Sequence, residues 1–360
     1  MKAVSTKQLC FITVILFTVG KFNFMPALSA RYLAEGLWVA PLINLSVDFI
    51  LLVFVLKLLE KNEDVSFYSF LKGKFGKPLA VAIAVLLCAY LILKSLIPLL
   101  EEKSAIELTF YESQPSELTF LPVFLILFYV ASKGINAFSR SVEIVIWFFA
   151  ASILTLGLLS AFGADYFNLL PLLNNNPAAY LKASYNTFLW FGDPFMLLFF
   201  MGKIKLSGRF KTKMIISYAI YAFILLAGLI VAYAVFGAIT ERQYYLPLKI
   251  SKYSPTLSNV GRFDYLSAMM LVMASVFELS SFVLFAAETF NDAFGIRKKF
   301  LMPAVITVSV AAVSVILGNG FFSTLYFAQK YFTPFFFATC YVLPIAFFIP
   351  LKNRFRRKSV

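Results

Sequence analysis

Ten apolar stretches follow one another along this chain, separated by charged or turn-forming residues. Most are near the ~20 residues that a helix needs to cross the hydrocarbon core of a bilayer. Hydrophobic residues make up 61% of the chain and charged residues 14%, whereas soluble domains are roughly 45–50% apolar. We predict an all-α integral membrane protein with ten transmembrane helices, at about 8–34, 37–59, 78–100, 118–132, 138–162, 184–202, 213–239, 265–290, 300–319 and 331–351.

The composition excludes several kinds of chemistry. The chain has no histidine, so histidine bases and histidine metal ligands are excluded. Three cysteines lie far apart in apolar stretches, which fits neither a disulfide framework nor a metal motif. Gly192-Asp193 is similar to part of an intramembrane aspartyl-protease motif, but Trp190 breaks that pattern. We expect no enzyme activity, no catalytic residue, no metal and no cofactor.

Connecting segments that are rich in lysine and arginine alternate along the chain with segments that contain few of them. Most of the 32 basic residues fall in segments that share one side of the membrane if the chain crosses it ten times. Because basic residues are retained on the cytoplasmic side, we predict cytoplasmic N- and C-termini. The net charge of +14 therefore indicates topology rather than nucleic-acid binding.

Three connecting segments have features of their own. Residues 66–75 mix aromatic residues with lysines, which favours a short helix on the cytoplasmic leaflet. Residues 168–185 contain two prolines and suggest a lid or an interfacial element, and the acidic residues 101–117 belong to an outside segment.

Two of the ten stretches carry signals of an interrupted helix. The first contains Gly20, Lys21 and Pro26 within seven residues, and the sixth contains Gly192-Asp193-Pro194. Glycine costs a helix about 1 kcal/mol relative to alanine and an interior proline about 3 kcal/mol, and a charge at the bilayer centre costs at least ~2.5–3.5 kcal/mol. Such interruptions are tolerated where protein or a water-filled cavity satisfies the freed backbone groups.

The two interruptions lie 172 residues apart, close to half the chain, with five stretches from one to the next. An odd number of crossings in each half inverts the second half, which is the layout of a five-plus-five inverted repeat with helices one and six broken. We predict one transmembrane domain, 1–360, with repeat one at about 8–162 and repeat two at about 184–351. The alternative is a pair of ordinary kinks in a ten-helix bundle.

Unwound helices expose N–H groups that favour a carboxylate and C=O groups that favour a cation. A zwitterionic amino acid fits both, and small hydroxylated nutrients are an alternative. Aromatic residues near the breaks, Phe22, Phe24, Trp190, Phe191 and Phe195, are expected to line the pocket. The predicted ligand-binding residues are Gly20, Lys21, Phe22, Phe191, Gly192, Asp193 and Pro194.

Charged residues inside the apolar stretches form a second prediction. Isolated buried charges are too costly, so we expect Lys21 to face two carboxylates in a neutralised cluster. In this hypothesis the lysine ammonium takes the place of a sodium ion, and one carboxylate handles a proton or the ligand's ammonium; the alternative is a purely structural ion pair. The predicted cluster is Lys21, Asp193, Glu278, Ser280 and Ser281. Asp48 is expected deep in the second stretch, Lys94 to reach toward the outside or to have a role, and Glu143 and Glu288 to be interfacial.

Several short motifs occur in order along the chain. They are Phe24-Met25-Pro26, Lys133-Gly134, residues 168–171 (Asn-Leu-Leu-Pro), Phe191-Gly192-Asp193, and Arg262 with Asp264. With these motifs the chain resembles the spore-germination permeases, the B-type subunits of nutrient-germinant receptors in the amino acid–polyamine–organocation superfamily. The third position of Phe-Gly-Asp is usually Glu in that family, and Lys21 matches no usual family residue.

The resemblance implies a LeuT-like fold with a small-nutrient site between helices one, three, six and eight, in which Gly20 and Phe191-Gly192-Asp193 form the germinant pocket. It also implies an A-type membrane subunit and a C-type lipoprotein as partners in the spore inner membrane. A nutrient-sensing receptor subunit is therefore the first functional hypothesis, and a proton-coupled amino-acid transporter is the alternative.

Overall fold

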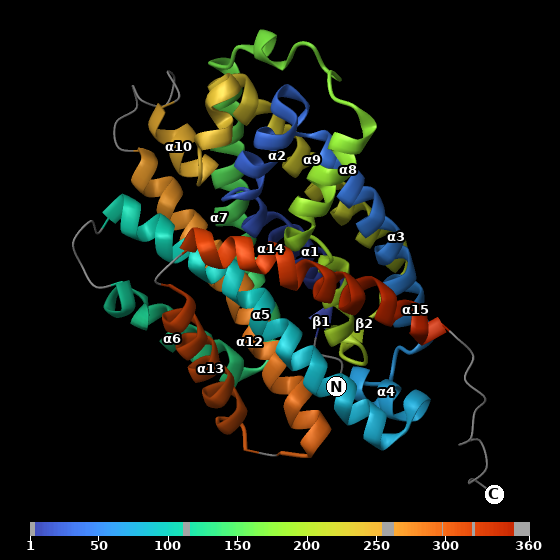
Figure 1. Cartoon of the computed structure of the whole chain (residues 1–360). Coiled ribbons are helices and arrows are strands. Elements are labelled where there is room, and N and C mark those ends of the chain that lie inside the picture. The colour runs from blue at the N-terminus through green and yellow to red at the C-terminus, as the bar shows by residue number, and fades with distance from the viewer. Residues whose placement is uncertain (1–3, 111–115, 254–262, 297, 319–320, 349–360) are drawn as a thin grey trace, which may run out of the picture.

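The computed structural model describes residues 4–110, 116–253, 263–296, 298–318 and 321–348. Arg262, Arg297 and the basic C-terminal residues 352–358, which contribute to the motifs and the charge pattern, lie outside the described residues. The described chain is almost entirely helical, and its helices form one bundle (Figure 1).

Six helical segments among the described residues are long and apolar enough to cross a membrane. Their high content of leucine, isoleucine, valine and phenylalanine leaves no continuous polar face, which is typical of spans surrounded by protein and lipid. They contain α3 (Val39–Lys61), α5 (Lys77–Phe110), α7 (Ile135–Phe162), α9 (Phe210–Phe236), α12 (Phe263–Phe294) and α14 (Phe321–Phe337), which continues through the π-helical η7 (Ala338–Val342) into α15 (Leu343–Phe348).

Two shorter apolar helices, α6 (Ser116–Lys133) and α13 (Leu301–Gly318), match the fourth and ninth predicted stretches. The first and sixth stretches are the two remaining ones, and both are interrupted. All ten predicted stretches therefore correspond, in order, to helical segments, although α5 and α12 extend beyond the predicted bounds.

The first span is broken as predicted. It consists of α1 (Thr6–Thr18), the 3₁₀ turn η1 (Val19–Lys21) and α2 (Met25–Leu33), with a 58° bend between its two arms. Pro26 lies in the first turn of α2, where its missing N–H has no intrahelical role. The fixed φ of proline suits the first turn of a helix, which explains why the chain becomes helical again at this residue.

The sixth span is broken more severely. Its first part is α8 (Pro177–Thr187) followed by η4 (Phe188–Trp190); Phe191 is then extended and Gly192 has φ +88°. The chain continues as the 3₁₀ helix η5 (Asp193–Phe200). The left-handed conformation of Gly192 is one that residues with a Cβ rarely adopt, so the glycine permits this break.

The two ends of the bundle differ in their connecting elements (Figure 1). At one end lie the predicted short helix α4 (Phe67–Phe75) and a parallel pair of short strands, β1 (Val4–Ser5) and β2 (Ile204–Lys205). We call this the α4 end. At the other end lie η2 (Ala34–Gly36), η3 (Tyr166–Leu169), α8, η6 (Gly237–Arg242) and α10 (Leu246–Tyr253). The segment predicted as a lid or an interfacial element, 168–185, thus overlaps the end of η3 and most of α8.

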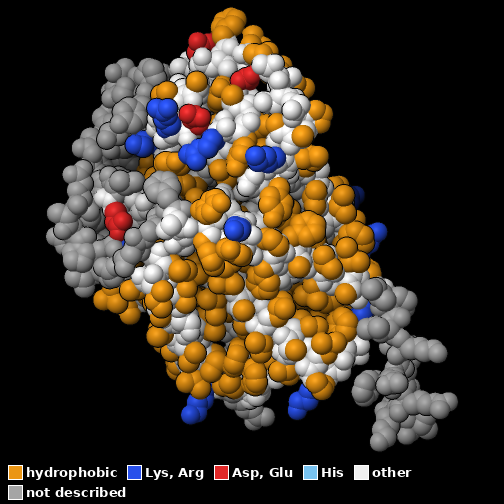
Figure 2. All heavy atoms as spheres, viewed as in Figure 1, with side chains coloured by type: hydrophobic (Ala, Val, Ile, Leu, Met, Phe, Trp, Pro, Cys, Tyr) orange, Lys and Arg blue, Asp and Glu red, His pale blue; other side chains and the backbone are white. Residues whose placement is uncertain are grey.

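The outer surface is strongly apolar (Figure 2). Trp147 on α7, Phe223 on α9 and Ile316 on α13 are each more than 70% exposed. On the face shown, lysine and arginine mark the lower edge, and charged residues of both signs gather in the upper part. Large exposed apolar areas mark surfaces that another apolar phase covers, here the bilayer.

Candidate functional site

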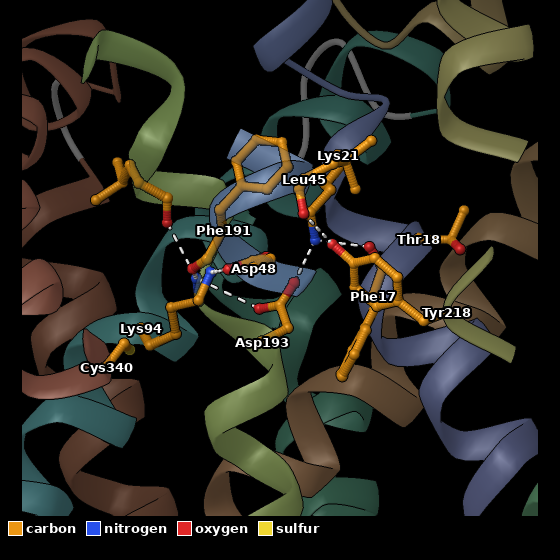
Figure 3. Close-up of polar contacts among 12 residues, drawn as sticks. Phe17, Thr18, Lys21, Leu45, Asp48, Lys94, Phe191, Asp193, Tyr218 and Cys340 are labelled. Carbon is orange, nitrogen blue, oxygen red and sulfur yellow. Dashed lines mark hydrogen bonds and ion pairs between the residues drawn. The ribbon is translucent and has the colours of Figure 1, made fainter. Parts of the chain in front are cut away.

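The two broken spans meet through a buried ion pair. The ammonium of Lys21 contacts the carboxylate of Asp193, and both side chains are at least 94% buried. Lys21 also donates a 2.6 Å hydrogen bond to the carbonyl of Phe17, in the last turn of α1 (Figure 3). The predicted contact between the two breaks is therefore present, and it joins residues that are 172 positions apart.

A second lysine approaches the same carboxylate from α5. Lys94 Nζ lies 3.5 Å from Asp193 Oδ1 and donates to the carbonyls of Leu189 (3.0 Å) and Phe191 (2.8 Å). Figure 3 shows Lys21 and Lys94 on two sides of Asp193. The expectation that Lys94 reaches toward the outside is wrong, because its ammonium satisfies carbonyls that the break in span six frees.

Asp48 on α3 holds the opposite side of that break. Its carboxylate accepts hydrogen bonds from the backbone N–H of Gly192, at 3.0 and 3.3 Å, and from the hydroxyl of Tyr341 in η7. Asp48 is completely buried, as its position in the second stretch predicted. An acceptor at the N-terminus of a half-helix is the arrangement that the helix dipole favours.

The carbonyls freed in span one have backbone partners. Phe22 O accepts from the N–H of Leu246 at 3.2 Å, and Asn23 O accepts from the N–H of Tyr245 at 2.9 Å. The start of α10 therefore supplies the hydrogen bonds that the interrupted helix lacks. This arrangement meets the requirement that buried backbone groups at membrane depth are paired.

These contacts follow one electrostatic rule. The two ammonium groups lie at the C-terminal ends of the first half-helices, where carbonyls point, and the carboxylates of Asp48 and Asp193 lie at the start of the second half of span six. The dipoles of the half-helices favour these signs at these ends. The protein thus carries its own cations at positions where unwound carbonyls attract one.

A small cavity lies beside the ion pairs. It offers about 20 Å³ to the centre of a water molecule, room for about one water. Its lining combines both breaks with α5 and α12, and it includes Gly20, Lys21, Lys94, Pro98, Glu101, Trp190, Asp193 and Glu278.

Among the described residues that line this cavity, Glu278 has a carboxylate oxygen without a hydrogen-bond partner. It is 7% exposed, and its Oε2 has no hydrogen-bond partner among the described residues. It faces Gly20 so closely that a Cβ on Gly20 would come within 3.2 Å of both carboxylate oxygens. The absence of a side chain at Gly20 therefore makes the space in which Glu278 lies.

The acidic residues at the end of span three belong to the site. Glu101 and Glu102, which we expected in an outside segment, are buried in α5 at 0% and 6% exposure. The indole N–H of Trp190 donates to Glu101 at 2.9 Å, and the amide of Asn23 donates to both glutamates at 3.3–3.4 Å. The reason is that α5 continues to Phe110, well beyond its most apolar part.

Of the seven predicted ligand-binding residues, Gly20, Lys21 and Asp193 line the cavity, whereas Phe22 does not. Phe22 lines a separate groove and packs against Gly228 on α9. Phe191 lies under the ammonium of Lys21, 5.3 Å from Nζ to the ring centre. Pro194 occupies the first turn of η5, beside Asp193.

The expected ring of aromatic residues is only partly formed at the cavity. Trp190 lines it, whereas Phe24 stacks on Tyr244 and Phe195 packs edge-on against Tyr90. These two phenylalanines support the helices around the breaks.

The serines of the predicted cluster bond their own helix. Ser280 donates to the carbonyl of Val276 and Ser281 to the carbonyl of Glu278, each at 2.6 Å. Glu288 pairs with Lys203 at the α4 end, and Glu143 accepts from Gln8. Among the described residues, no group of three or more Cys, Asp or Glu side chains forms a metal site.

The fold is similar to that of several solved transporters. A mutant of the manganese transporter of Eremococcus coleocola matches with a TM-score of 0.64 and 14% identity, over 94% of this chain and 78% of that one. A Na⁺-coupled sialic acid symporter matches with 0.64 and 12% identity, over 92% and 79%. MhsT in complex with L-phenylalanine matches with 0.62 and 14% identity, over 94% and 96%.

Together, the helix bundle, its two broken spans and these matches define an integral membrane protein with the LeuT-like fold of small-molecule transporters. A family model described as "Spore germination protein" matches residues 3–319. The chain therefore belongs to the spore germination permease family, which confirms the predicted resemblance. No curated protein matches the sequence significantly.

Proposed function

We propose that this protein is a nutrient receptor subunit that binds a small zwitterion, in particular an amino acid, between the two broken helices, and that binding starts germination. The observation that carries the proposal is the cavity in which both charges of a zwitterion have a partner. Glu278 offers an unused carboxylate oxygen, and Lys21 faces the same space.

The hydrogen-bond donors of Lys94 and Lys21 indicate where each end of the ligand binds. An ammonium has three donors. Lys94 directs them to two carbonyls and Asp193, whereas the oxygen partners of Lys21 among the described residues are Phe17 O and Asp193. A ligand carboxylate therefore fits at Lys21, and a ligand ammonium fits at Glu278. The cavity now holds about one water, so an amino acid enters only when its walls move apart.

The contacts that hold the break in span six suit a sensing role, because a bound ligand can compete for them. The break in span six is fixed by side chains from two other spans, Lys94 from α5 and Asp48 from α3. A ligand that competes for one of these contacts shifts the equilibrium between two helix arrangements. Partner subunits, an A-type membrane protein and a C-type lipoprotein, would then register the shift in the spore inner membrane, with both termini of this chain in the cytoplasm.

The experiment is a thermal-shift panel of amino acids, sugars and nucleosides on the purified protein in detergent. Glu278→Gln removes the unused charge without breaking a described hydrogen bond of Oε2, so the fold should survive. We expect an amino acid to raise the Tm of the parent protein and to lose at least tenfold in apparent affinity in Glu278→Gln. Glu143→Gln is the matched control, because Glu143 lies on the exposed face of α7. Equal ligand responses in Glu278→Gln and the parent would contradict the proposal.

A proton-coupled amino-acid transporter is the second candidate, and the buried carboxylates favour it. Glu278 and Glu101 line one cavity, and Asn23 bridges Glu101 and Glu102. Intramembrane carboxylates of this kind form the proton relays of pumps and transporters. Saturable accumulation of an amino acid in proteoliposomes of this chain alone, driven by a pH gradient, would favour transport; binding without flux would favour sensing.

A further inference from the structure

A second concave site lies away from the cavity between the breaks. It is a groove of about 370 Å³ between α7, α9 and the start of α10, within the size range of small-molecule pockets (~300–1,000 Å³). Gly157 on α7 leaves open space in the groove, and Phe22 from the break of span one packs on Gly228 of α9 to form part of the wall. None of the described side chains that line the groove is charged.

The rim of this groove faces the bilayer. Leu154 and Leu158 on α7 and Phe223 on α9 line it and are 59%, 57% and 72% exposed. Water does not stably fill an apolar cavity, and the neighbouring phase at this depth is hydrocarbon. The occupant that the surroundings supply is therefore a hydrocarbon chain.

The position of the groove along α7 indicates which kind of hydrocarbon chain occupies it. Gly157 lies five residues before the end of α7 at Phe162, which is ~8 Å at 1.5 Å per residue. Ser160 lies between Gly157 and that end; it is fully buried, lines the groove, and its hydroxyl has no partner among the described residues. An apolar chain whose polar end lies near the membrane surface matches both features.

The shape of the groove also selects the occupant. A Cβ on Gly157 would meet nothing within 4 Å, while one on Gly228 would come within 2.5 Å of the Phe22 ring. The space is therefore a recess that is open beside Gly157 and closed by the Phe22 ring at Gly228. A helix is about 10–12 Å across with its side chains, so a flexible single chain fits the recess better than a partner helix.

We propose that this groove binds one acyl chain of a membrane phospholipid, and that the bound chain supports the break in span one. The groove wall and the break share the same backbone: Leu246 lines the groove, and its N–H bonds the carbonyl of Phe22. Phe22 itself lines the groove and packs against Gly228. Filling the groove therefore restrains the residues that satisfy the freed carbonyls.

The test uses the whole protein in dioleoylphosphatidylcholine vesicles that contain a phospholipid with a diazirine in its acyl chain. After illumination, labelled peptides are mapped by mass spectrometry. We expect labelling of residues 153–161 and 246–250 at least several-fold above labelling of α13, whose Val308 and Ile316 are also highly exposed. Labelling of the groove no higher than that of α13 would overturn the proposal, and so would displacement of the lipid by a co-purifying protein.

A pair of variants at one position supplies the matched control. Gly157→Phe adds a ring to the groove at a position where a Cβ meets nothing within 4 Å, and Gly157→Ala changes the same backbone position with little added volume. We expect Phe to abolish the enhanced labelling at 246–250 and to reduce the rise in Tm that added phospholipid gives to delipidated protein, while Ala leaves both unchanged. Equal labelling and equal lipid response in the Phe and Ala variants would overturn the proposal. No nutrient is present in these measurements, so their outcome is independent of the proposed receptor function.

Discussion

Lys94 donates a 2.8 Å hydrogen bond to the carbonyl of Phe191, so a charged side chain from span three closes the backbone gap in span six. The same ammonium lies 3.5 Å from Asp193. Asp193 is thus shared by Lys94 and by Lys21 of the other broken span. The site is a connected set of charges. Lys21, Lys94 and Asp48 each bond a backbone group at or next to a break. Asp193 contacts both lysines.

The first prediction concerns Lys94→Met. It leaves two buried carbonyls without their donor and takes one of two cations from Asp193. Removing one partner of a buried charged interaction typically costs about 3–5 kcal/mol, so we expect a clear loss of folded protein and a lower Tm, measured by size-exclusion chromatography and thermal unfolding. Lys182→Met, at an exposed position on α8, is the control; if both variants had the same Tm, Lys94 would have no structural role.

The second prediction separates a structural from a functional role of Lys21. Lys21→Met and Asp193→Asn each leave a buried charge with fewer partners, whereas the double variant removes both. We expect the double variant to be more stable than the sum of the single effects predicts, by a coupling of about 0.5–3 kcal/mol, in thermal unfolding.

The ligand response of the same variants completes that test. If Lys21 binds the nutrient carboxylate, Lys21→Met and the double variant both lose the ligand-induced rise in Tm. A full ligand response in Lys21→Met would mean that Lys21 forms a structural ion pair and does not bind the ligand.

The third prediction concerns the backbone of Gly192. Its φ is +88°, and a Cβ at this position would come within 3.0 Å of Cys340 Sγ and 3.1 Å of Cys340 Cβ. A left-handed conformation costs an ordinary residue about 1–2 kcal/mol, so Gly192→Ala should lower the Tm by several degrees. Gly208→Ala, where a Cβ meets nothing within 4 Å and φ is not positive, should leave it nearly unchanged. Similar Tm values for the two variants would argue against the break at Gly192.

The sequence predicted the architecture because the relevant signals are local. Runs of apolar residues mark the spans, and glycine, proline and charge coincide at Gly20–Pro26 and Gly192–Pro194, where the structure breaks both helices. The contact between Lys21 and Asp193 followed from the cost of leaving either charge alone in the membrane. The repeat boundaries at about 8–162 and 184–351 remain predictions.

The partners of the breaks could not be predicted, because they depend on which faces of distant helices meet. Lys94 sits in an ordinary apolar stretch, and only the fold shows that its ammonium points to Phe191. Glu101 looked external because charges follow it, yet α5 continues and buries it against Trp190. Phe22 is adjacent to Lys21 in sequence but packs away from the cavity, against Gly228.

The most direct measurement is an experimental density map of the protein with the amino acid that gives the largest thermal shift. We predict ligand density between Gly20, Lys21 and Glu278, flanked by two helices that are interrupted at Val19–Phe24 and at Phe191–Gly192. Ligand density at any other place, or a continuous helix through either interruption, would contradict the proposed site.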